Sequence, residues 1–290
     1  MKRWGLFILT NILVIITINV LLSVLGIGSY ITAAGLDYYN LSIFCLIWGM
    51  AGSFISLLLS KKMAKWMMGV QVIDAKDSGQ YRWLVDTVHN LARKAQLPKM
   101  PEVGVYPSAE VNAFATGPSR SNSLVAVSEG ILHAMNQDEL EGVLAHEVAH
   151  IQNGDMVTMT LIQGVVNAFA LFLSKVIAHF VSQSVDEENR WLIRLIVDQV
   201  AYIVLTLLGF LVVCWFSRQR EFRADRGSAR LCGSPSKMVK ALQKLGSLHG
   251  VAIEKRSAMD TAKISGGKNF RFSPLSTHPS VEARIHALGA

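Results

Sequence analysis

Long stretches without a charged residue constrain this chain more than any other feature of its sequence. No charge occurs in Trp4–Leu36, and a second uncharged run covers Tyr38–Ser60. A helix of about 20 apolar residues crosses the hydrocarbon core of a bilayer. We therefore expect two membrane-spanning helices here. They should form an uncleaved anchor, because the apolar run is too long for the core of a typical signal peptide.

Two further uncharged runs, Met156–Ser174 and Gln199–Ser217, lie in the second half of the chain. Their helical extensions bring in Lys175, Arg194 and Asp198, and charges inside a membrane are costly. The runs therefore predict either two more spanning helices or a partly embedded hairpin. The predicted fold class is a mostly α membrane protein with up to four transmembrane helices.

The composition fits a membrane protein better than a soluble one. Of the 290 residues, 51% are hydrophobic and 17% are charged, whereas soluble domains usually carry about 25% charge. The net charge of +7 does not indicate a nucleic-acid partner, since the basic residues gather beside the apolar runs. Cys45, Cys214 and Cys232 have no CxxC spacing, which argues against a disulfide framework or a cysteine-based zinc site.

The positions of Lys and Arg predict the orientation in the membrane, because these residues favour the cytoplasmic side. The loop Ile27–Asp37 contains no Lys or Arg, and Ser182–Asn189 has three acids and no base. The basic clusters all flank the ends of the uncharged runs that lie opposite these two loops: Lys2 and Arg3; Lys61, Lys62 and Lys65; Arg218, Arg220 and Arg223. Both termini and the polar segments are thus predicted to face the cytoplasm.

The alternation of apolar and polar segments predicts four parts. Residues 1–60 form a two-helix anchor, and residues 61–155 form the first part of a cytoplasmic domain. Residues 156–217 form the hydrophobic hairpin, and residues 218–290 complete the cytoplasmic domain. Short alternating runs in the first polar part predict a small β-sheet within a mostly helical domain.

A well-delimited helix is predicted over Gln137–Gln152. Asn136 can cap its first turn, with Glu139 completing a capping box, and Gly154 marks its end. This helix carries a His-Glu-x-x-His motif at residues 146–150.

The motif has the geometry of a metal site. His146 and His150 are four residues apart, so both imidazoles point the same way and can bind one metal ion. Glu147 lies about 100° around the helix and can reach water activated by that metal. The alternative is a chance pair of surface histidines, but the capped helical context favours the metal.

A catalytic zinc ion takes three protein ligands, so a third must come from elsewhere in the chain. Glu221 and Asp225 are also four residues apart on one predicted helix face. Glu221 could bind the metal, and Asp225 could accept a hydrogen bond from a ligand histidine. Spacing alone, however, favours a solvated charged face after a membrane segment.

The order of these motifs resembles a known family. His-Glu-x-x-His, two hydrophobic segments and then EFRADRGSA at residues 221–229 are similar to the HtpX-type membrane zinc metalloproteases, relatives of the type-1 CaaX prenyl proteases. The resemblance covers nearly the whole chain. It implies one zinc ion per chain bound by His146, His150 and Glu221, with Glu147 as the catalytic general base and Asp225 supporting a histidine.

The resemblance also implies residues that handle the substrate. NAFATG at residues 112–117 would be an edge strand beside the cleft, where a peptide can add as a further strand; its substrate-binding residues are Asn112, Ala113, Phe114 and Ala115. His278 would stabilise the oxyanion, although Ser280 stands where the family motif has proline. Arg284 either orients the active site or pairs with Glu282.

The predicted function is that of a membrane-bound zinc metalloendopeptidase with a zincin-like catalytic domain. It would hydrolyse misfolded membrane proteins by zinc-activated water, as quality control under envelope or heat stress. It would be a multi-pass protein of the bacterial inner membrane, with the bilayer and polypeptide substrates as its partners.

Two alternatives stay open. One is a processing protease of the prenyl-protein type, although four spans are fewer than the large membrane chamber of that subfamily requires. The other is a non-catalytic, zinc-stabilised membrane scaffold, against which the intact Glu147 argues, since a structural zinc site has no need of that carboxylate.

Overall fold

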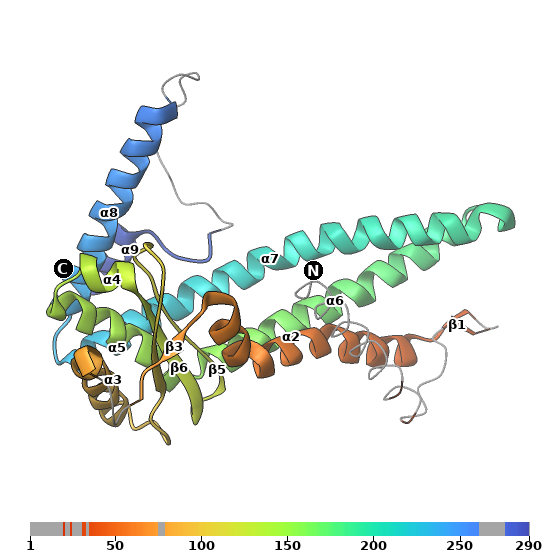
Figure 1. Ribbon diagram of the computed structural model, residues 1–290. Coiled ribbons are helices and arrows are strands. Elements are labelled where there is room, and N and C mark those ends of the chain that lie inside the picture. The colour runs from red at the N-terminus through yellow and green to blue at the C-terminus, as the bar shows by residue number, and fades with distance from the viewer. Residues whose placement is uncertain are drawn as a thin grey trace. The chain divides into compact units, whose positions relative to one another are not determined.

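The computed structural model describes residues 20, 24, 31–32, 35–74, 79–260 and 276–289 (Figure 1). The first uncharged run therefore falls almost entirely outside the described residues. The chain divides into two compact units, each built from two separate stretches: residues 1–56 with 160–213, and residues 57–159 with 214–290. The division into four parts expected from the sequence stays a prediction.

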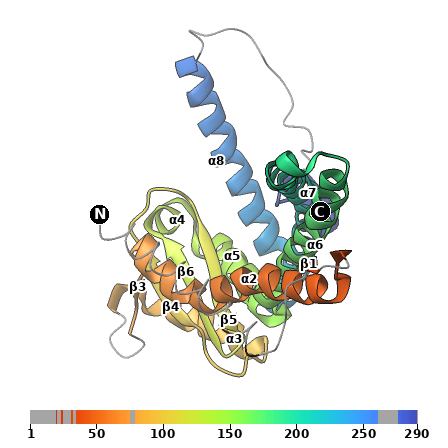
Figure 2. The ribbon, with the colours of Figure 1, turned by 90° about the vertical axis from the view of Figure 1, so that its right-hand side faces the viewer.

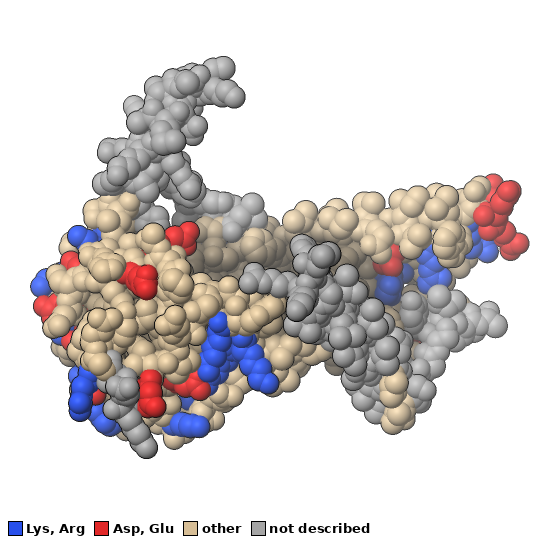
Figure 3. Space-filling view, in the orientation of Figure 1, with Lys and Arg blue, Asp and Glu red and all other residues tan. Residues whose placement is uncertain are grey.

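Three helices among the described residues are long and apolar enough to cross a membrane: α2 (Tyr38–Met68), α6 (Asp155–Gln183) and α7 (Glu187–Cys232). The two-residue strands β1 (Ile31–Thr32) and β2 (Gly35–Leu36) pair before α2. The turn between α6 and α7 carries acidic side chains, and the adjoining helical surface is largely uncharged (Figure 3). These helices confirm a mostly α membrane protein.

In the first unit, α2 and α6 approach closely at a glycine. A Cβ on Gly49 would lie 2.3 Å from the backbone nitrogen of Ala168, and small residues allow such contacts between membrane helices. Two of the three charges noted there in the sequence form an ion pair: Lys175 Nζ lies 3.0 Å from Asp198 Oδ2. The Ser174 hydroxyl lies 2.7 Å from the other oxygen of Asp198.

The second unit contains a four-stranded sheet in the order β3-β4-β6-β5. The pairing of β4 with β6 is parallel, and the other two pairings are antiparallel. The strands are β3 (Gln71–Val72), β4 (Glu102–Tyr106), β5 (Ala113–Ser119) and β6 (Asn122–Ser128). The sheet confirms the small β-structure predicted from the alternating runs.

Both faces of this sheet are covered, in keeping with β6, which is buried from Ser123 to Ser128. Val125 and Val127 face a large apolar core shared with α3 (Arg82–Lys94) and α5 (Gln137–Asn153). Leu124 and Ala126 face the opposite side, toward the end of α2 (Figure 2). The alternation follows from the twofold repeat of side chains along a strand.

Helix α5 begins and ends as its sequence predicts. The Asn136 side chain accepts a hydrogen bond from the Glu139 backbone, and the Glu139 carboxylate accepts one from the Asn136 backbone. Gly154 ends the helix in the left-handed conformation, at φ 70°. The preceding helix α4 (Glu129–Ala134) was not predicted, because six residues are too few to show a helical period.

The C-terminal part of the second unit begins within α7. This helix is continuous for 46 residues, so the segment that carries Glu221 is an extension of an apolar helix. After it come α8 (Ser236–Asp260) and α9 (Val281–Ala287), the latter capped by the Ser280 side chain. A single 3-10 turn, η1 (Gly79–Tyr81), precedes α3.

Candidate metal centre and active site

Three buried side chains from two distant helices converge on one point. His146 and His150 come from α5 and Glu221 comes from α7. The two histidine Nε2 atoms are 3.1 Å apart. Glu221 Oε2 is 3.5 Å from Nε2 of His146, and Oε1 is 3.4 Å from Nε2 of His150. Ligands about 2.0–2.2 Å from a tetrahedral ion lie about 3.3–3.6 Å apart. Both distances from Glu221 fall in this range and the distance between the histidines is slightly shorter, so the set is close to that expected for a small divalent cation.

The state of Glu221 favours a cation at this point. The residue is 2% exposed, and its Oε1 atom accepts no hydrogen bond from any described residue. The nearest basic nitrogens are Nε2 of His150 at 3.4 Å and Nε of Arg220 at 3.5 Å, and a buried carboxylate oxygen without a hydrogen bond is costly. A positive ion among the three ligand atoms would satisfy it, so the donor set and its burial suit a metal.

His146 is held from behind by residues far away in the sequence. Its Nδ1 atom lies 2.9 Å from Asp225 Oδ1. Asp225 in turn accepts two hydrogen bonds from Arg284, at 2.8 Å from Nε and 2.7 Å from Nη2. A carboxylate on the outer nitrogen fixes the ring so that the other nitrogen faces the metal.

His150 has an equivalent support that the sequence reasoning missed. Its Nδ1 atom lies 2.6 Å from Asp155 Oδ2, and Arg223 binds the other oxygen of Asp155. Asp155 is 1% exposed. The sequence did contain a sign of this support: Asp155 directly follows Gly154, the residue that ends α5 in the left-handed conformation. The chain reverses at this glycine, so the Asp155 side chain lies close to the last turn of α5.

The carboxylates around the histidines change their proton affinity. Burial alone would lower the pKa of His150, but the neighbouring carboxylates of Asp155 and Glu221 raise it to about 9. The pKa of His146 is also raised, since Asp225 and Glu221 outweigh the effect of burial. The site thus attracts positive charge, whether carried by protons or by a metal ion.

Glu147 lies beside this cluster without belonging to it. The residue is half-buried on α5, and its carboxylate has no hydrogen-bond or ion-pair partner among the described residues. Its charge still contributes to the raised pKa of both histidines. A free carboxylate next to the ligand set can exchange a proton there.

The C-terminal residues expected at the site are brought to it. His278 Nδ1 lies 3.0 Å from Glu221 Oε2. The His278 side chain is 61% exposed. Arg284 is buried and bonds Asp225, and no ion pair between Arg284 and Glu282 is found among the described residues. The backbone of Ser276 anchors this segment by accepting a hydrogen bond from Arg218 on α7.

Close packing fixes Glu221 relative to the histidines. A Cβ on Gly227 would lie 2.6 Å from the Ala149 side chain, so α7 and α5 touch almost backbone to backbone. One residue on, the Ser228 hydroxyl donates a hydrogen bond to the Gly142 carbonyl oxygen at 2.8 Å. The contact sets the spacing between the two helices that share the metal site.

Residues 78–290 match the family model for peptidase family M48. The chain belongs to this family. It is 52% identical over 298 residues to the protease HtpX homolog of Bacillus subtilis (strain 168), covering 100% of this chain and 99% of that protein. It is 50% identical over 294 residues to the homolog from Janthinobacterium sp. (strain Marseille), covering 99% of each.

A solved structure has a similar fold. The crystal structure of S. mikatae Ste24p aligns with a TM-score of 0.60 at 17% identity, covering 99% of this chain. The chain spans 66% of the length of that protein. The M48 assignment confirms the resemblance drawn from the motifs: the protein is an HtpX-type membrane metalloprotease, and its reaction is hydrolysis of polypeptides.

In this M48 peptidase the predicted substrate strand is an edge strand. β5 is last in the sheet order, and it lies against α5. The Asn112 carbonyl accepts a hydrogen bond from Ser128, so Asn112 and Phe114 turn their backbone groups toward β6. Antiparallel ladders alternate. Ala113 and Ala115 therefore turn their N–H and C=O groups to the open edge.

Proposed function

We propose that this M48 peptidase is a zinc endopeptidase that cleaves misfolded membrane proteins at the cytoplasmic face of the bacterial inner membrane. The observation that carries the proposal is the triangle of His146, His150 and Glu221, whose donor atoms lie 3.1–3.5 Å apart. These three residues would hold the zinc ion. Nitrogen and carboxylate ligands in this number leave an open position, as catalytic zinc sites do.

The residues around the metal have separate tasks in the reaction. Bound zinc supplies Lewis acidity that polarises a carbonyl and makes water more acidic. Glu147 removes a proton from the attacking water and delivers it to the amine that leaves when the C–N bond breaks. His278 donates a hydrogen bond to the carbonyl oxygen as it gains negative charge.

The substrate is held as an added strand. An extended peptide that pairs with Ala113 and Ala115 would lie along the open edge of β5, beside α5. Backbone pairing of this kind selects for extended chains rather than for a particular sequence. This suits a protease that removes unfolded segments of many different membrane proteins.

A direct test compares two substitutions of the same kind on α5. Full-length protein in lipid nanodiscs would be assayed on a destabilised membrane-protein substrate, with zinc content measured in parallel. Glu147→Gln should keep zinc and lose about two to four orders of magnitude in rate. Glu141→Gln, whose carboxylate pairs with Lys237 away from the metal cluster, should keep both. Equal loss of zinc in Glu147→Gln and His146→Ala would contradict the role given to Glu147.

The orientation rests on the asymmetry of Lys and Arg and has its own test. Asp86 and Glu188 are both exposed, in α3 and near the α6–α7 turn respectively. In intact spheroplasts, a membrane-impermeant thiol reagent should label Glu188→Cys and leave Asp86→Cys unlabelled until the membrane is opened. Ready labelling of Asp86→Cys in intact spheroplasts would reverse the proposed topology.

A further inference from the structure

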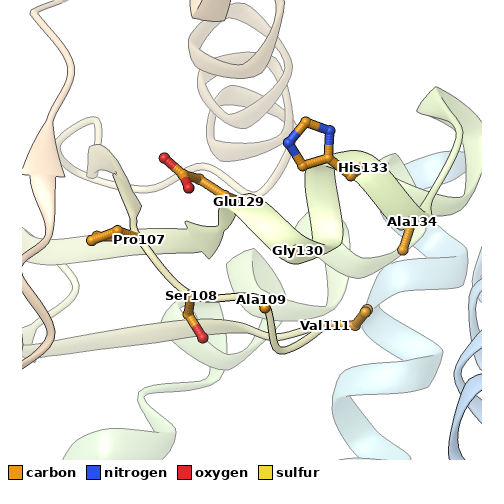
Figure 4. Close-up of a pocket in the computed structure, with 8 residues that line it drawn as sticks. All are labelled: Pro107, Ser108, Ala109, Val111, Glu129, Gly130, His133 and Ala134. Carbon is orange, nitrogen blue, oxygen red and sulfur yellow. The ribbon is translucent and has the colours of Figure 1, made fainter.

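The proposed chemistry makes no use of a groove at one end of the sheet. It lies where β4 and β6 end and β5 begins, between the loop of residues 107–111 and α4 (Figure 4). Its cavity volume is about 590 Å³, which falls in the range typical of ligand pockets. The two walls come from segments that the motifs of the family do not include.

The groove has fixed walls. The Gly130 backbone N–H donates a hydrogen bond to the Ser108 carbonyl at 2.8 Å, and the Ser128 hydroxyl donates one to the Glu110 carbonyl. A Cβ on Gly130 would lie 2.4 Å from the Ala109 carbonyl oxygen, so the loop and α4 are in direct backbone contact. A preformed pocket costs little ordering when a ligand binds.

The groove continues the open edge of β5. Backbone groups on that edge alternate, so Ala115 and Ala113 face outward and Val111 follows two residues upstream. Val111 lines the groove. A peptide paired with Ala113 advances about 7 Å for every two residues. If the peptide continues in the same direction past the start of β5, its next pair of residues would reach Val111 and the groove.

The lining shows which side chain the groove accepts. Ala109 and Val111 supply apolar surface on the loop side, while Glu129 and His133 project from the same side of α4 (Figure 4). Glu129 is exposed, and its carboxylate forms no ion pair with any described residue. Lysine and arginine match this arrangement, because their stems cover apolar surface and their heads carry the opposite charge.

We propose that this groove is a substrate subsite that recognises a lysine or arginine side chain, with Glu129 as the residue that determines the preference. The subsite reads one position of the polypeptide, two residues beyond the one that pairs with Ala113. The inference rests on the proposed function, because it requires a peptide bound along β5. Backbone pairing along β5 does not select particular side chains. The subsite would add a preference for one type of side chain at one position.

The test uses internally quenched peptides that differ only by Lys, Gln or Glu at successive positions around the scissile bond. The full-length protein in nanodiscs should cleave the Lys peptide about two- to fivefold faster in kcat/KM than the Gln peptide at one position, the size expected for an exposed ion pair. Glu129→Gln should remove that difference, and Glu129→Asp should keep it. Glu129→Lys should reverse it in favour of Glu.

The control is Asp86→Asn, which removes the same charge from an exposed residue of α3 and should leave the preference unchanged. A Lys preference that survives Glu129→Gln, or no preference at any position, would overturn the inference and leave the protease function standing. Equal inactivity of the wild type and Glu147→Gln on every peptide would instead overturn the proposed function, and the subsite with it.

Discussion

Each of the two units contains a cluster of polar side chains that are wholly or partly buried among apolar ones. The clusters differ in whether their polar groups already have partners. In the first unit, Lys175, Asp198 and Ser174 bond to one another, so the positive and negative charges cancel within the cluster. In the second unit, the ligand atoms of His146, His150 and Glu221 face each other across 3.1–3.5 Å.

This difference separates a structural cluster from a binding site. Lys175 and Asp198 neutralise each other between two apolar helices, which limits the cost of a charge there. In the second unit, each histidine is fixed from behind by a carboxylate and an arginine, yet Glu221 Oε1 has no hydrogen bond. The hydrogen bonds behind the two histidines are complete, whereas a carboxylate oxygen of Glu221 that faces the ligand atoms lacks one. This combination suits a site that binds a cation.

The largest effect should follow from removing the third ligand. Glu221→Ala leaves only two protein ligands, so zinc retention at limiting metal and proteolysis should both be lost. Asp198→Ala removes a partly buried carboxylate from the other cluster and should keep zinc. Metal analysis of the two purified variants checks the contrast. Full zinc occupancy in Glu221→Ala would mean that the two clusters do not differ in this way.

The next effect concerns the stability of the hairpin. Asp198→Ala removes the carboxylate that pairs with the partly buried Lys175 between α6 and α7, at a cost of about 1–3 kcal/mol. Replacing both residues, as Lys175→Met with Asp198→Leu, should recover most of the stability because no unpaired charge remains. Thermal unfolding in nanodiscs measures both variants. Equal stability of the single variant and the wild type would show that the pair is unimportant.

A smaller effect is expected behind the histidines. Asp155→Asn and Asp225→Asn should each weaken zinc binding by about 10–100-fold, as the loss of a carboxylate behind a ligand histidine does. Competition with a chelator of known affinity gives the value. Glu102→Gln, which removes a carboxylate far from the metal ligands, should leave zinc affinity unchanged. A matching loss in all three variants would point to a general structural effect.

The smallest effect is a pH dependence outside both clusters. Glu102 is partly buried, which opposes its charged form, but the ion pairs to Lys65 and Lys61 prevail and lower the pKa of the carboxyl. A lowered pKa adds stability above the unfolded value of about 4.3, and that stability is lost as the pH falls through the folded value. When the pH is lowered from 7 to 4, the Tm of the wild type should therefore fall slightly more than the Tm of Glu102→Gln. An identical loss of Tm would show that the ion pairs of Glu102 contribute nothing measurable to stability.

Local features of the second unit follow from sequence alone. The capping box at Asn136 and Glu139, the His-Glu-x-x-His spacing and the glycine at the end of α5 involve neighbours within a few residues. Short-range geometry on a helix is nearly independent of the rest of the molecule. The apolar runs also predict their structure from sequence alone, because a run of about 20 apolar residues has few alternatives to a membrane-spanning helix.

Contacts across the chain needed the tertiary structure. Spacing by itself favours a solvated face for Glu221 and Asp225, and it leaves two possible roles for Arg284. The continuous α7, packed on α5 at Gly227, turns Glu221 and Asp225 inward together. A shift of one residue in that helix would rotate them by about 100°.

The sequence by itself determined that this protein has apolar helices and carries two histidines on one face of a capped helix. Tertiary structure decided which carboxylate completes the set and which arginines hold the supporting acids. The physical reason is the range of the interactions. A helix places residues four apart on one face whatever surrounds it, whereas Glu221 reaches the histidines only because close packing of two distant segments fixes both their separation and their rotation.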